Sequence, residues 1–266
     1  MTGRLQDKVV IVTGAGSVGP GWGNGRAIAY RFAQEGARVF AVDLDLAALE
    51  ETVARVNEAG GDIATWQADV TSSQAVQAMV DACVDKWGRV DILVNNVGGS
   101  RKGGPANLDE SSWDKQIDFN LKSVYLGCRH VLPLMEKQGG GAIVNIASTS
   151  GIRWTGSAQV GYASAKAGVI QLSRVVAVEY AKKNIRCNTV VPGQMHTPMV
   201  EVRLAGQRAG GNVDQLLAER QSRIPLPFMG DGLDTANAAL FLASDEARFI
   251  TATEIVVDGG MSARCD

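Results

Sequence analysis

Short runs of apolar, often β-branched residues alternate along the chain with longer stretches in which apolar residues recur every three or four positions. Runs of the first kind are typical of strands, and stretches of the second kind are typical of helices with one buried face. Seven segments are predicted to be strands: 8–14, 37–43, 62–70, 90–96, 141–148, 185–193 and 253–260. Five intervening segments are predicted to be helices: 26–34, 46–57, 74–87, 112–138 and 162–182.

Most of the expected strands are continuous apolar runs, without the apolar–polar alternation of a half-exposed strand. Such strands are typical of parallel sheets that helices cover on both faces. Repeated strand–helix units with right-handed crossovers wind such a sheet in both directions. The pattern therefore predicts an α/β fold of the Rossmann type, with one doubly wound parallel sheet of about seven strands and helices on both faces.

The chain shows no internal repeat, no low-complexity tract and no linker, so residues 1–266 are expected to form a single domain. One segment departs from the alternating pattern. Residues 197–231 are polar and are interrupted by several glycines and prolines. Long excursions of this kind often carry function. We expect a mobile lid over the substrate here, with one or two short helices.

Composition and charge narrow the choice of function. The 266 residues, 45% of them hydrophobic, can bury a large core, and a formal net charge of −2 gives no basic surplus for nucleic acid or anionic lipid. No run of about 18 apolar residues predicts a membrane span, and the first residues do not resemble a secretion signal. Four scattered cysteines and only two histidines argue against a metal site and favour reduced thiols in the cytoplasm.

Six glycines fall between Thr13 and Gly25, where the first expected strand ends and the first expected helix begins. Glycine permits tight turns and close approach of a phosphate to the backbone, and the N-terminus of the following helix attracts an anion. The loop therefore predicts a diphosphate cradle. Asp43 ends the second strand 18 residues after Gly25, where it can accept hydrogen bonds from ribose hydroxyls and would repel a 2′-phosphate. Because the next residue, Leu44, is not basic, the expected cofactor is NAD and not NADP.

Further motifs follow the glycine loop along the chain. They are NNVG at 95–98, Asn120 in the fourth expected helix, Ser148 in NIASTSG, YASAK at 162–166, PGQMHTPM at 192–199 and VDGG at 257–260. In this order, and over essentially the whole chain, they resemble the motifs of the short-chain dehydrogenase/reductase family. The chain departs from the family's TGxxxGxG loop by five additional residues, 18–22. We expect these residues to bulge outward and to leave Ser17, Asn24 and Gly25 at the phosphates.

The resemblance implies a catalytic group of Asn120, Ser148, Tyr162 and Lys166. A tyrosine with its usual pKa of about 10 is a poor base at neutral pH. Lys166 lies one helical turn after Tyr162, and its ammonium favours the phenolate, which can act as a general base. Ser148 is expected to hydrogen-bond the substrate oxygen and stabilise its charge. Asn120 is expected to hold a water in a proton relay to Lys166.

The resemblance also implies which residues surround the dinucleotide. The expected cofactor residues are Gly14, Ser17, Asn24, Gly25, Asp43, Asp69, Val70, Asn96, Gly98, Tyr162, Lys166, Met195 and Thr197. Among them, residues 69–70 would flank the adenine, residues 96–98 would line the nicotinamide ribose and ring, and residues 195–197 would meet the carboxamide and a phosphate. A homotetramer built through the two long helices and the C-terminal strand is implied as well.

These features predict an NAD-dependent dehydrogenase/reductase that transfers a hydride to or from a secondary alcohol or ketone. Substrate contacts are expected from Ser150, Arg153, Trp154 and Gln159. Arg153 could bind an anionic group through its fork of donors, although a solvated surface charge is the preferred interpretation. Three alternatives remain open: an NADP-dependent ketoreductase of the 3-oxoacyl type, an epimerase, and a regulator that senses NAD(H) without turnover. The complete catalytic group argues against the sensor, and Asp43 argues against NADP.

Overall fold

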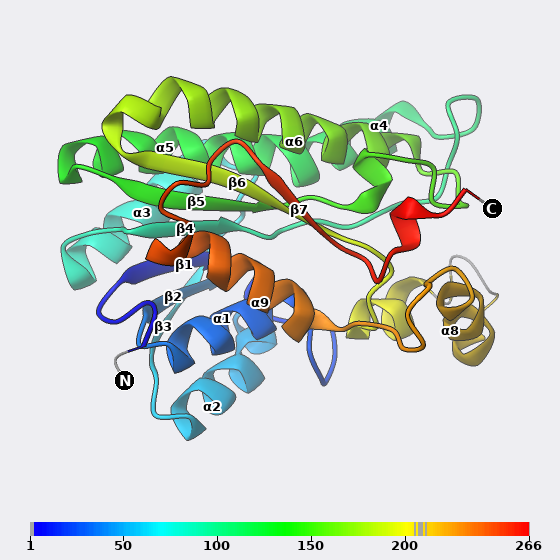
Figure 1. Ribbon diagram of the computed structural model, residues 1–266, viewed down its shortest axis with the longest axis horizontal. Helices are drawn as coiled ribbons and strands as arrows, with labels where there is room; N and C mark the ends of the chain where they lie inside the picture. The colour runs from blue at the N-terminus through cyan, green and yellow to red at the C-terminus, as the bar shows by residue number, and fades with distance from the viewer. Residues whose placement is uncertain (1–2, 205, 207–209, 211, 266) are drawn as a thin grey trace.

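The computed structural model describes residues 3–204, 206, 210 and 212–265. Within these residues, seven strands form one parallel sheet in the order β3-β2-β1-β4-β5-β6-β7 (Figure 1). The strands are β1 (Val9–Thr13), β2 (Arg38–Asp43), β3 (Asp62–Gln67), β4 (Ile92–Asn95), β5 (Gly141–Ile146), β6 (Ile185–Pro192) and β7 (Glu254–Val257). The prediction of a doubly wound parallel sheet is confirmed.

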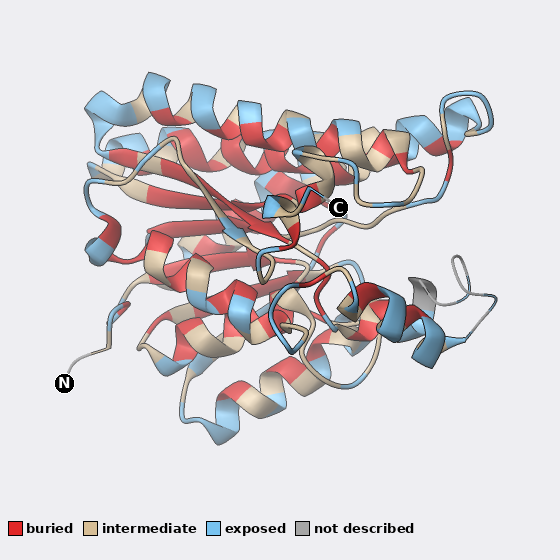
Figure 2. Cartoon of the chain, turned by 45° about the vertical axis from the view of Figure 1, so that its right-hand side comes forward, coloured by how far each residue is buried: buried red, intermediate tan, exposed pale blue. Residues whose placement is uncertain are grey.

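Helices cover both faces of the sheet (Figure 1). One layer consists of α1 (Asn24–Gln34), α2 (Glu50–Glu58) and α9 (Gly232–Ala243). The other layer consists of α3 (Ser73–Trp87), α4 (Glu110–Ile117), α5 (Ser123–Gln138) and α6 (Val160–Tyr180). Each of these helices turns buried residues toward the sheet and exposed residues toward solvent (Figure 2).

Strand β1 shows why the expected strands are apolar throughout. All five of its residues are buried. Val9 and Ile11 belong to the core cluster that includes side chains of α3, α5 and α6, whereas Val10 and Val12 belong to the cluster that includes side chains of α1 and α9. Because successive side chains of a strand point to opposite faces, a strand between two helical layers buries side chains on both faces and is mostly apolar; the exception in β1 is the buried Thr13 at its end.

The strand order determines where a site can form. From β1 the chain proceeds outward to β3 and then crosses to β4, which pairs with the other edge of β1. In sheets of this type a crevice opens at the carboxyl ends of the two strands where the order reverses. The glycine loop follows β1, and the NNVG motif begins at Asn95, the last residue of β4, so both lie at this edge of the sheet.

The expected helix 112–138 is divided in the structure. A π-helical turn, Asp118–Lys122, separates α4 from α5. The helical stretch also begins earlier, at Glu110, because the Asp109 side chain accepts a hydrogen bond from the backbone N–H of Ser112 at 2.8 Å. The periodic pattern predicts the helical stretch, but it does not reveal the widened turn inside it.

Two further elements differ from their expected form. The helix expected at 46–57 begins as a 3₁₀ turn, Leu46–Leu49, where the Asp45 side chain accepts from Ala47 N at 3.0 Å, and α2 follows. Strand β3 ends at Gln67 and is largely exposed, because it lies at the edge of the sheet and pairs with β2.

The segment expected to form a lid contains a second π-helical turn, Val200–Leu204, and the short helix α8 (Val213–Gln221). Val200 and Leu216 are buried against each other in a small cluster apart from the two main cores. Residues 205, 207–209 and 211 of the expected lid lie outside the described residues.

Candidate active site

A cleft of about 910 Å³ lies at the carboxyl ends of the strands. Most of the residues expected at the cofactor line it: Gly14, Ser17, Asn24, Gly25, Asp43, Asp69, Val70, Asn96, Gly98, Tyr162 and Thr197. The structure therefore brings together residues that are spread over more than half of the chain. Lys166 and Met195, whose side chains are both buried, do not line the cleft.

Some residues of the cleft had no sequence signal. They include Ala47, Ala48 and Phe119. Met199 and Val202 also line the cleft, and both belong to the segment expected to form a lid. Phe119 belongs to the first π-helical turn and lies against Gly99, where a Cβ atom would be 3.2 Å from the Phe119 ring. The carbonyl of Ala48 accepts a hydrogen bond from Ser17 N at 3.3 Å. Ala47 and Ala48 enter the cleft from the 3₁₀ turn Leu46–Leu49, and Phe119 enters it from the π-helical turn Asp118–Lys122. The helical pattern predicted neither turn.

The glycine loop is packed as a phosphate cradle requires. Gly14 has a φ of +62°, and a Cβ atom on Gly25 would lie 1.8 Å from the carbonyl oxygen of Gly14. Asn96 fixes the same turn, since its Nδ2 donates to the Gly14 carbonyl at 2.9 Å. Helix α1 begins at Asn24 without a side-chain cap, so the N–H groups of its first turn remain available to an anion.

Asn24 supplies a further polar group at this position. Its Oδ1 atom is buried and has no hydrogen-bond partner within the described part of the chain. Unpaired buried polar atoms are rare in folded proteins, and an amide that turns toward a bound anion can donate from Nδ2. The uncapped helix, the close backbone turn at Gly14 and the amide of Asn24 together fit a diphosphate group.

Asp43 ends β2 and lines the cleft. Its Oδ2 accepts from Gly16 N at 3.0 Å, which ties the carboxylate to the glycine loop. The residues described as lining this cleft include Asp43, Asp45 and Asp69 but neither lysine nor arginine. The cleft is therefore acidic near the end of β2.

Tyr162 and Lys166 lie one turn apart near the start of α6. Tyr162 lines the cleft, whereas Lys166 is buried, with its Nζ 5.8 Å from the centroid of the Tyr162 ring. Lys166 Nζ donates to the carbonyl of Ile146, at the end of β5, at 2.8 Å. Burial lowers the pKa of Lys166 to about 8, which still leaves most of this group protonated at neutral pH. A buried positive charge thus lies beside a phenol at the surface of the cleft.

Asn120 lies in the π-helical turn and is fully buried. Its Oδ1 accepts from Gly99 N at 3.0 Å, and its Nδ2 donates to the carbonyls of Gly99 and Gln116 at 3.1 and 2.9 Å. A Cβ atom on Gly98 would lie 2.9 Å from Asn120 Oδ1 and 2.8 Å from Lys166 Nζ. The lack of a side chain at Gly98 therefore lets Asn120 and Lys166 approach the same point of the backbone.

Ser148 follows β5 and begins the 3₁₀ turn Thr149–Gly151. Its Oγ accepts a hydrogen bond from Ser150 N at 3.2 Å, so the hydroxyl hydrogen can still be donated to another oxygen. Ser148 lines neither the cleft nor the second pocket described next. The Ile146 carbonyl that holds Lys166 lies two residues before it, so both groups are fixed by the end of β5.

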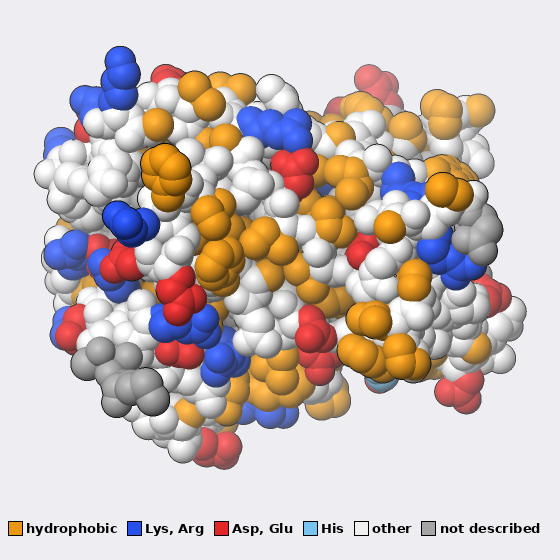
Figure 3. Space-filling model, viewed as in Figure 1, with side chains coloured by type: hydrophobic (Ala, Val, Ile, Leu, Met, Phe, Trp, Pro, Cys, Tyr) orange, Lys and Arg blue, Asp and Glu red, His pale blue; other side chains and the backbone are white. Residues whose placement is uncertain are grey.

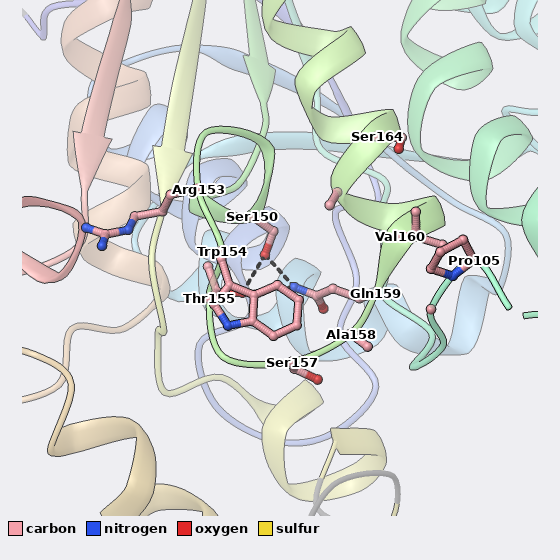
Figure 4. Close-up of a pocket in the computed structure, with 12 residues that line it drawn as sticks. Pro105, Ser150, Arg153, Trp154, Thr155, Ser157, Ala158, Gln159, Val160 and Ser164 are labelled. Atoms are coloured by element: carbon pink, nitrogen blue, oxygen red, sulfur yellow. Dashed lines mark hydrogen bonds between the residues drawn. The ribbon is translucent and has the colours of Figure 1, made fainter. Parts of the chain in front are cut away.

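The four expected substrate residues surround a second pocket of about 340 Å³ (Figure 4). Ser150, Arg153, Trp154 and Gln159 line this pocket, and none of them lines the cofactor cleft. Gln159 Nε2 donates to Ser150 Oγ at 2.6 Å and to Thr155 Oγ1 at 3.1 Å, which holds the loop between β5 and α6 together. Trp154 is 71% exposed. Through Ser150, the wall of this pocket is joined to the expected catalytic serine.

The guanidinium of Arg153 turns away from the other pocket residues (Figure 4). It donates to the backbone carbonyls of Met261, Ser262 and Arg264, with a distance of 2.9 Å to the last of them. This charge therefore attaches the loop between β5 and α6 to the C-terminal segment. The geometry does not direct it at a ligand in the second pocket.

Two general findings concern the rest of the molecule. Among the described helices, none combines the length and the apolar character needed to cross a bilayer. Within the described residues, no group of three or more histidine, cysteine, aspartate or glutamate side chains has the arrangement of a metal site.

Comparison with known proteins defines the class of this site. A family model described as enoyl-(acyl carrier protein) reductase matches residues 20–262. The levodione reductase of Leifsonia aquatica is 40% identical over 98% of this chain and 97% of its own length. A solved short-chain dehydrogenase/reductase of Burkholderia xenovorans is 66% identical, with a TM-score of 0.96 and coverage of 99% of this chain and 100% of the other. The carveol dehydrogenase of Mycobacterium avium, solved in complex with NAD, is 34% identical, with a TM-score of 0.91 and coverage of 99% and 100%.

The chain belongs to the short-chain dehydrogenase/reductase family. The resemblance of its motifs to that family is confirmed. Its activity is that of an oxidoreductase for alcohols or ketones, in a family that uses nicotinamide cofactors.

Proposed function

We propose that the chain is an NAD-dependent dehydrogenase/reductase of secondary alcohols and ketones, with Tyr162 as general acid and base. The observation that carries this proposal is the pairing of Tyr162, at the cleft surface, with the buried ammonium of Lys166. When bound, the nicotinamide takes up or supplies the hydride. The protein transfers the accompanying proton and positions the substrate oxygen atom from which, or to which, that proton moves.

The proton transfer follows from the charges around Tyr162. A buried cation beside the ring favours the phenolate over the phenol. During oxidation the phenolate oxygen accepts the proton of the substrate hydroxyl, and during reduction the phenol returns a proton to the carbonyl oxygen. Ser148 donates a hydrogen bond to that oxygen and stabilises its partial negative charge. Asn120 holds the backbone at Gly99, and the proposed water relay runs past it to Lys166.

The preference for NAD over NADP rests on the acidic end of the cleft. Asp43 is expected to accept hydrogen bonds from the adenosine ribose, with Leu44 beside it 65% exposed. A 2′-phosphate in that position would face carboxylates, and no described lining residue offers a cation to bind it. The carveol dehydrogenase of similar structure was solved with NAD, which agrees with this preference.

We expect the substrate to be a small uncharged alcohol or ketone with an apolar body. The second pocket supplies apolar surface from Pro105, Trp154 and Val160. Its one cationic lining residue among those described, Arg153, is engaged with backbone carbonyls. An anionic substrate group would therefore find no free donor fork in this pocket.

A homotetramer built through α5, α6 and β7 also belongs to this proposal. Tyr125 of α5, Val175 and Val178 of α6, and Val256 of β7 are between 40% and 71% exposed. Figure 3 shows hydrophobic side chains across the face of the molecule on which β7 lies. Sedimentation equilibrium would give the mass of the assembly. A single catalytic domain, a lid at 197–231 and a cytoplasmic location remain predictions.

The substitution Tyr162→Phe tests the proposed chemistry. It removes one oxygen atom and keeps the ring beside Lys166, so we expect NADH formation to fall by about 10²–10⁴-fold. The affinity for NADH, measured by fluorescence titration, should change little. Turnover equal to that of the wild type would favour the sensor or another chemistry. An NADP arm in the same alcohol screen separates the NADP-dependent ketoreductase alternative.

A further inference from the structure

The five inserted residues of the glycine loop, 18–22, are held by one buried arginine. Arg26, in the first turn of α1, is 2% exposed. Its Nη1 donates to the carbonyls of Gly19 and Gly21 at 3.1 and 2.7 Å and to Glu51 Oε2 at 2.6 Å. Its Nε donates to Thr52 Oγ1 at 3.3 Å. The guanidinium thus joins the inserted loop to α2.

Glu51 fixes the same loop from the side of α2. Its Oε1 accepts from Gly21 N at 3.4 Å and from Arg55 Nε at 2.9 Å. The Arg55 guanidinium lies 4.3 Å from the centroid of the Trp22 ring, a cation–π contact. Burial lowers the pKa of Arg26, and the Glu51 carboxylate counteracts this effect. The loop is therefore tied at both its carbonyl and its N–H groups.

The other side of the inserted loop faces the segment after β6. Cβ atoms on Gly19 would lie 3.4 Å from Val202 and 3.5 Å from Pro198, and Gly21 also faces Pro198. Val18 and Val202 both line the cofactor cleft. Of the inserted residues, Val18 therefore lines the cleft, next to Ser17 of the phosphate cradle, while Gly19 and Gly21 pack against the segment after β6.

We propose that Arg26 is a positioning residue for the dinucleotide, which holds the inserted loop in the shape that completes the cleft wall around the diphosphate. This inference rests on the proposed NAD(H) site. Three of the residues 18–23 are glycines, so without the guanidinium the loop has many accessible conformations. Ordering the loop upon binding would then weaken the affinity for ligands that carry the diphosphate. Adenosine, which is expected to contact the end near Asp43 and Val70, would be affected much less.

The experiment compares NADH and adenosine binding in Arg26→Leu and Arg26→Lys, with Arg31→Leu as the matched control. Arg31 lies in the same helix and bonds to Gln34, Glu35 and Asn237, away from the inserted loop. NADH affinity is measured by fluorescence titration and adenosine affinity by ligand-observed NMR. We expect the NADH Kd to rise about tenfold in Arg26→Leu and less in Arg26→Lys, whose ammonium cannot form the planar fork.

The ratio of the two affinities decides the inference. A loss of NADH affinity with unchanged adenosine affinity supports it, together with a raised KM for NAD and a less affected kcat. Folded Arg26 variants that keep the wild-type ratio would overturn it. If Arg26→Leu does not fold, Arg26→Lys gives the answer, because it retains the charge opposite Glu51. Wild-type protein that binds adenosine but not NADH would instead remove the proposed function itself.

Discussion

Replacing Asp43 by asparagine is expected to change the dinucleotide preference. It keeps the shorter of two backbone contacts, from Gly16 N, and gives up the longer one, from Asp45 N to Oδ1 at 3.4 Å. The carboxylate lines the cleft and accepts from Gly16 N through Oδ2 at 3.0 Å. Asparagine can keep an oxygen atom in that hydrogen bond while it loses the negative charge. The glycine loop therefore keeps its attachment to β2, and the main change at the cleft is the loss of one negative charge.

The size of the effect follows from Coulomb's law. At about 4 Å, two unit charges repel by about 1 kcal/mol in bulk water and by about 4 kcal/mol in the less polar surroundings near a protein surface. Asp43 is half-buried, so we take about 2 kcal/mol for its repulsion of a 2′-phosphate. Removing it should raise kcat/KM with NADP about 30-fold. The weaker hydrogen bond to the ribose should lower kcat/KM with NAD about tenfold.

The assay is the initial rate of NADH or NADPH formation with the same alcohol, expressed as the ratio of kcat/KM values. Asp62→Asn is the control, because it removes the same charge from the opposite end of the strand that pairs with β2. At physiological salt a charge that far from the cleft is largely screened. An Asp43→Asn protein with unchanged stability and no gain in NADP turnover would refute the electrostatic reasoning.

Two further substitutions test the cradle and the buried lysine. Gly25→Ala places a methyl group 1.8 Å from the Gly14 carbonyl oxygen, so we expect NADH binding to be lost in fluorescence titrations. The control Gly206→Ala, which has open space around its Cβ position, should bind NADH normally. Retained binding in Gly25→Ala would contradict the proposed cradle. Burial lowers the pKa of Lys166 from 10.5 to about 8, so the unfolded chain binds more protons than the folded chain between these pH values, and stability gained at this site rises with pH. We therefore compare the free energy of unfolding of Lys166→Met with that of the wild type, by urea titration at pH 8 and pH 10.5. The difference in favour of Lys166→Met should shrink by about 3 kcal/mol between these pH values. A difference that stays constant would argue against a buried ammonium.

The parts of this site that could be predicted from the sequence depend on local pattern and topology. Gly14 directly follows β1 and Asp43 ends the neighbouring parallel strand β2, so their meeting at one edge of the sheet follows once the strands are recognised. The four-residue spacing of Tyr162 and Lys166 places both on one face of α6. Each of these inferences needs only the chain near the residue and the order of the strands.

The remaining features depend on contacts between distant segments. The π-helical turn at Asn120 is held by amide hydrogen bonds to Gly99 and Gln116, for which the helical pattern carries no signal. In the sequence, Arg26 is indistinguishable from any polar residue of a helix, because its partner Glu51 is brought to it only by the packing of α1 against α2. The expected substrate residues line a pocket separate from the cofactor cleft, and Gln159 there bonds to Ser150, a choice of side-chain partner that spacing does not determine.

The hydrogen bonds between Arg153 and the C-terminal carbonyls have a practical consequence for purification. An affinity tag joined to the C-terminus would begin close to Arg264, whose carbonyl holds the loop that carries Trp154. A tag that displaces this carbonyl would shift the loop that lines the second pocket, and the changed kinetic constants would then reflect the tag and not the enzyme. The N-terminus lies well away from this segment (Figure 1), so a tag on that end leaves kinetic measurements undisturbed.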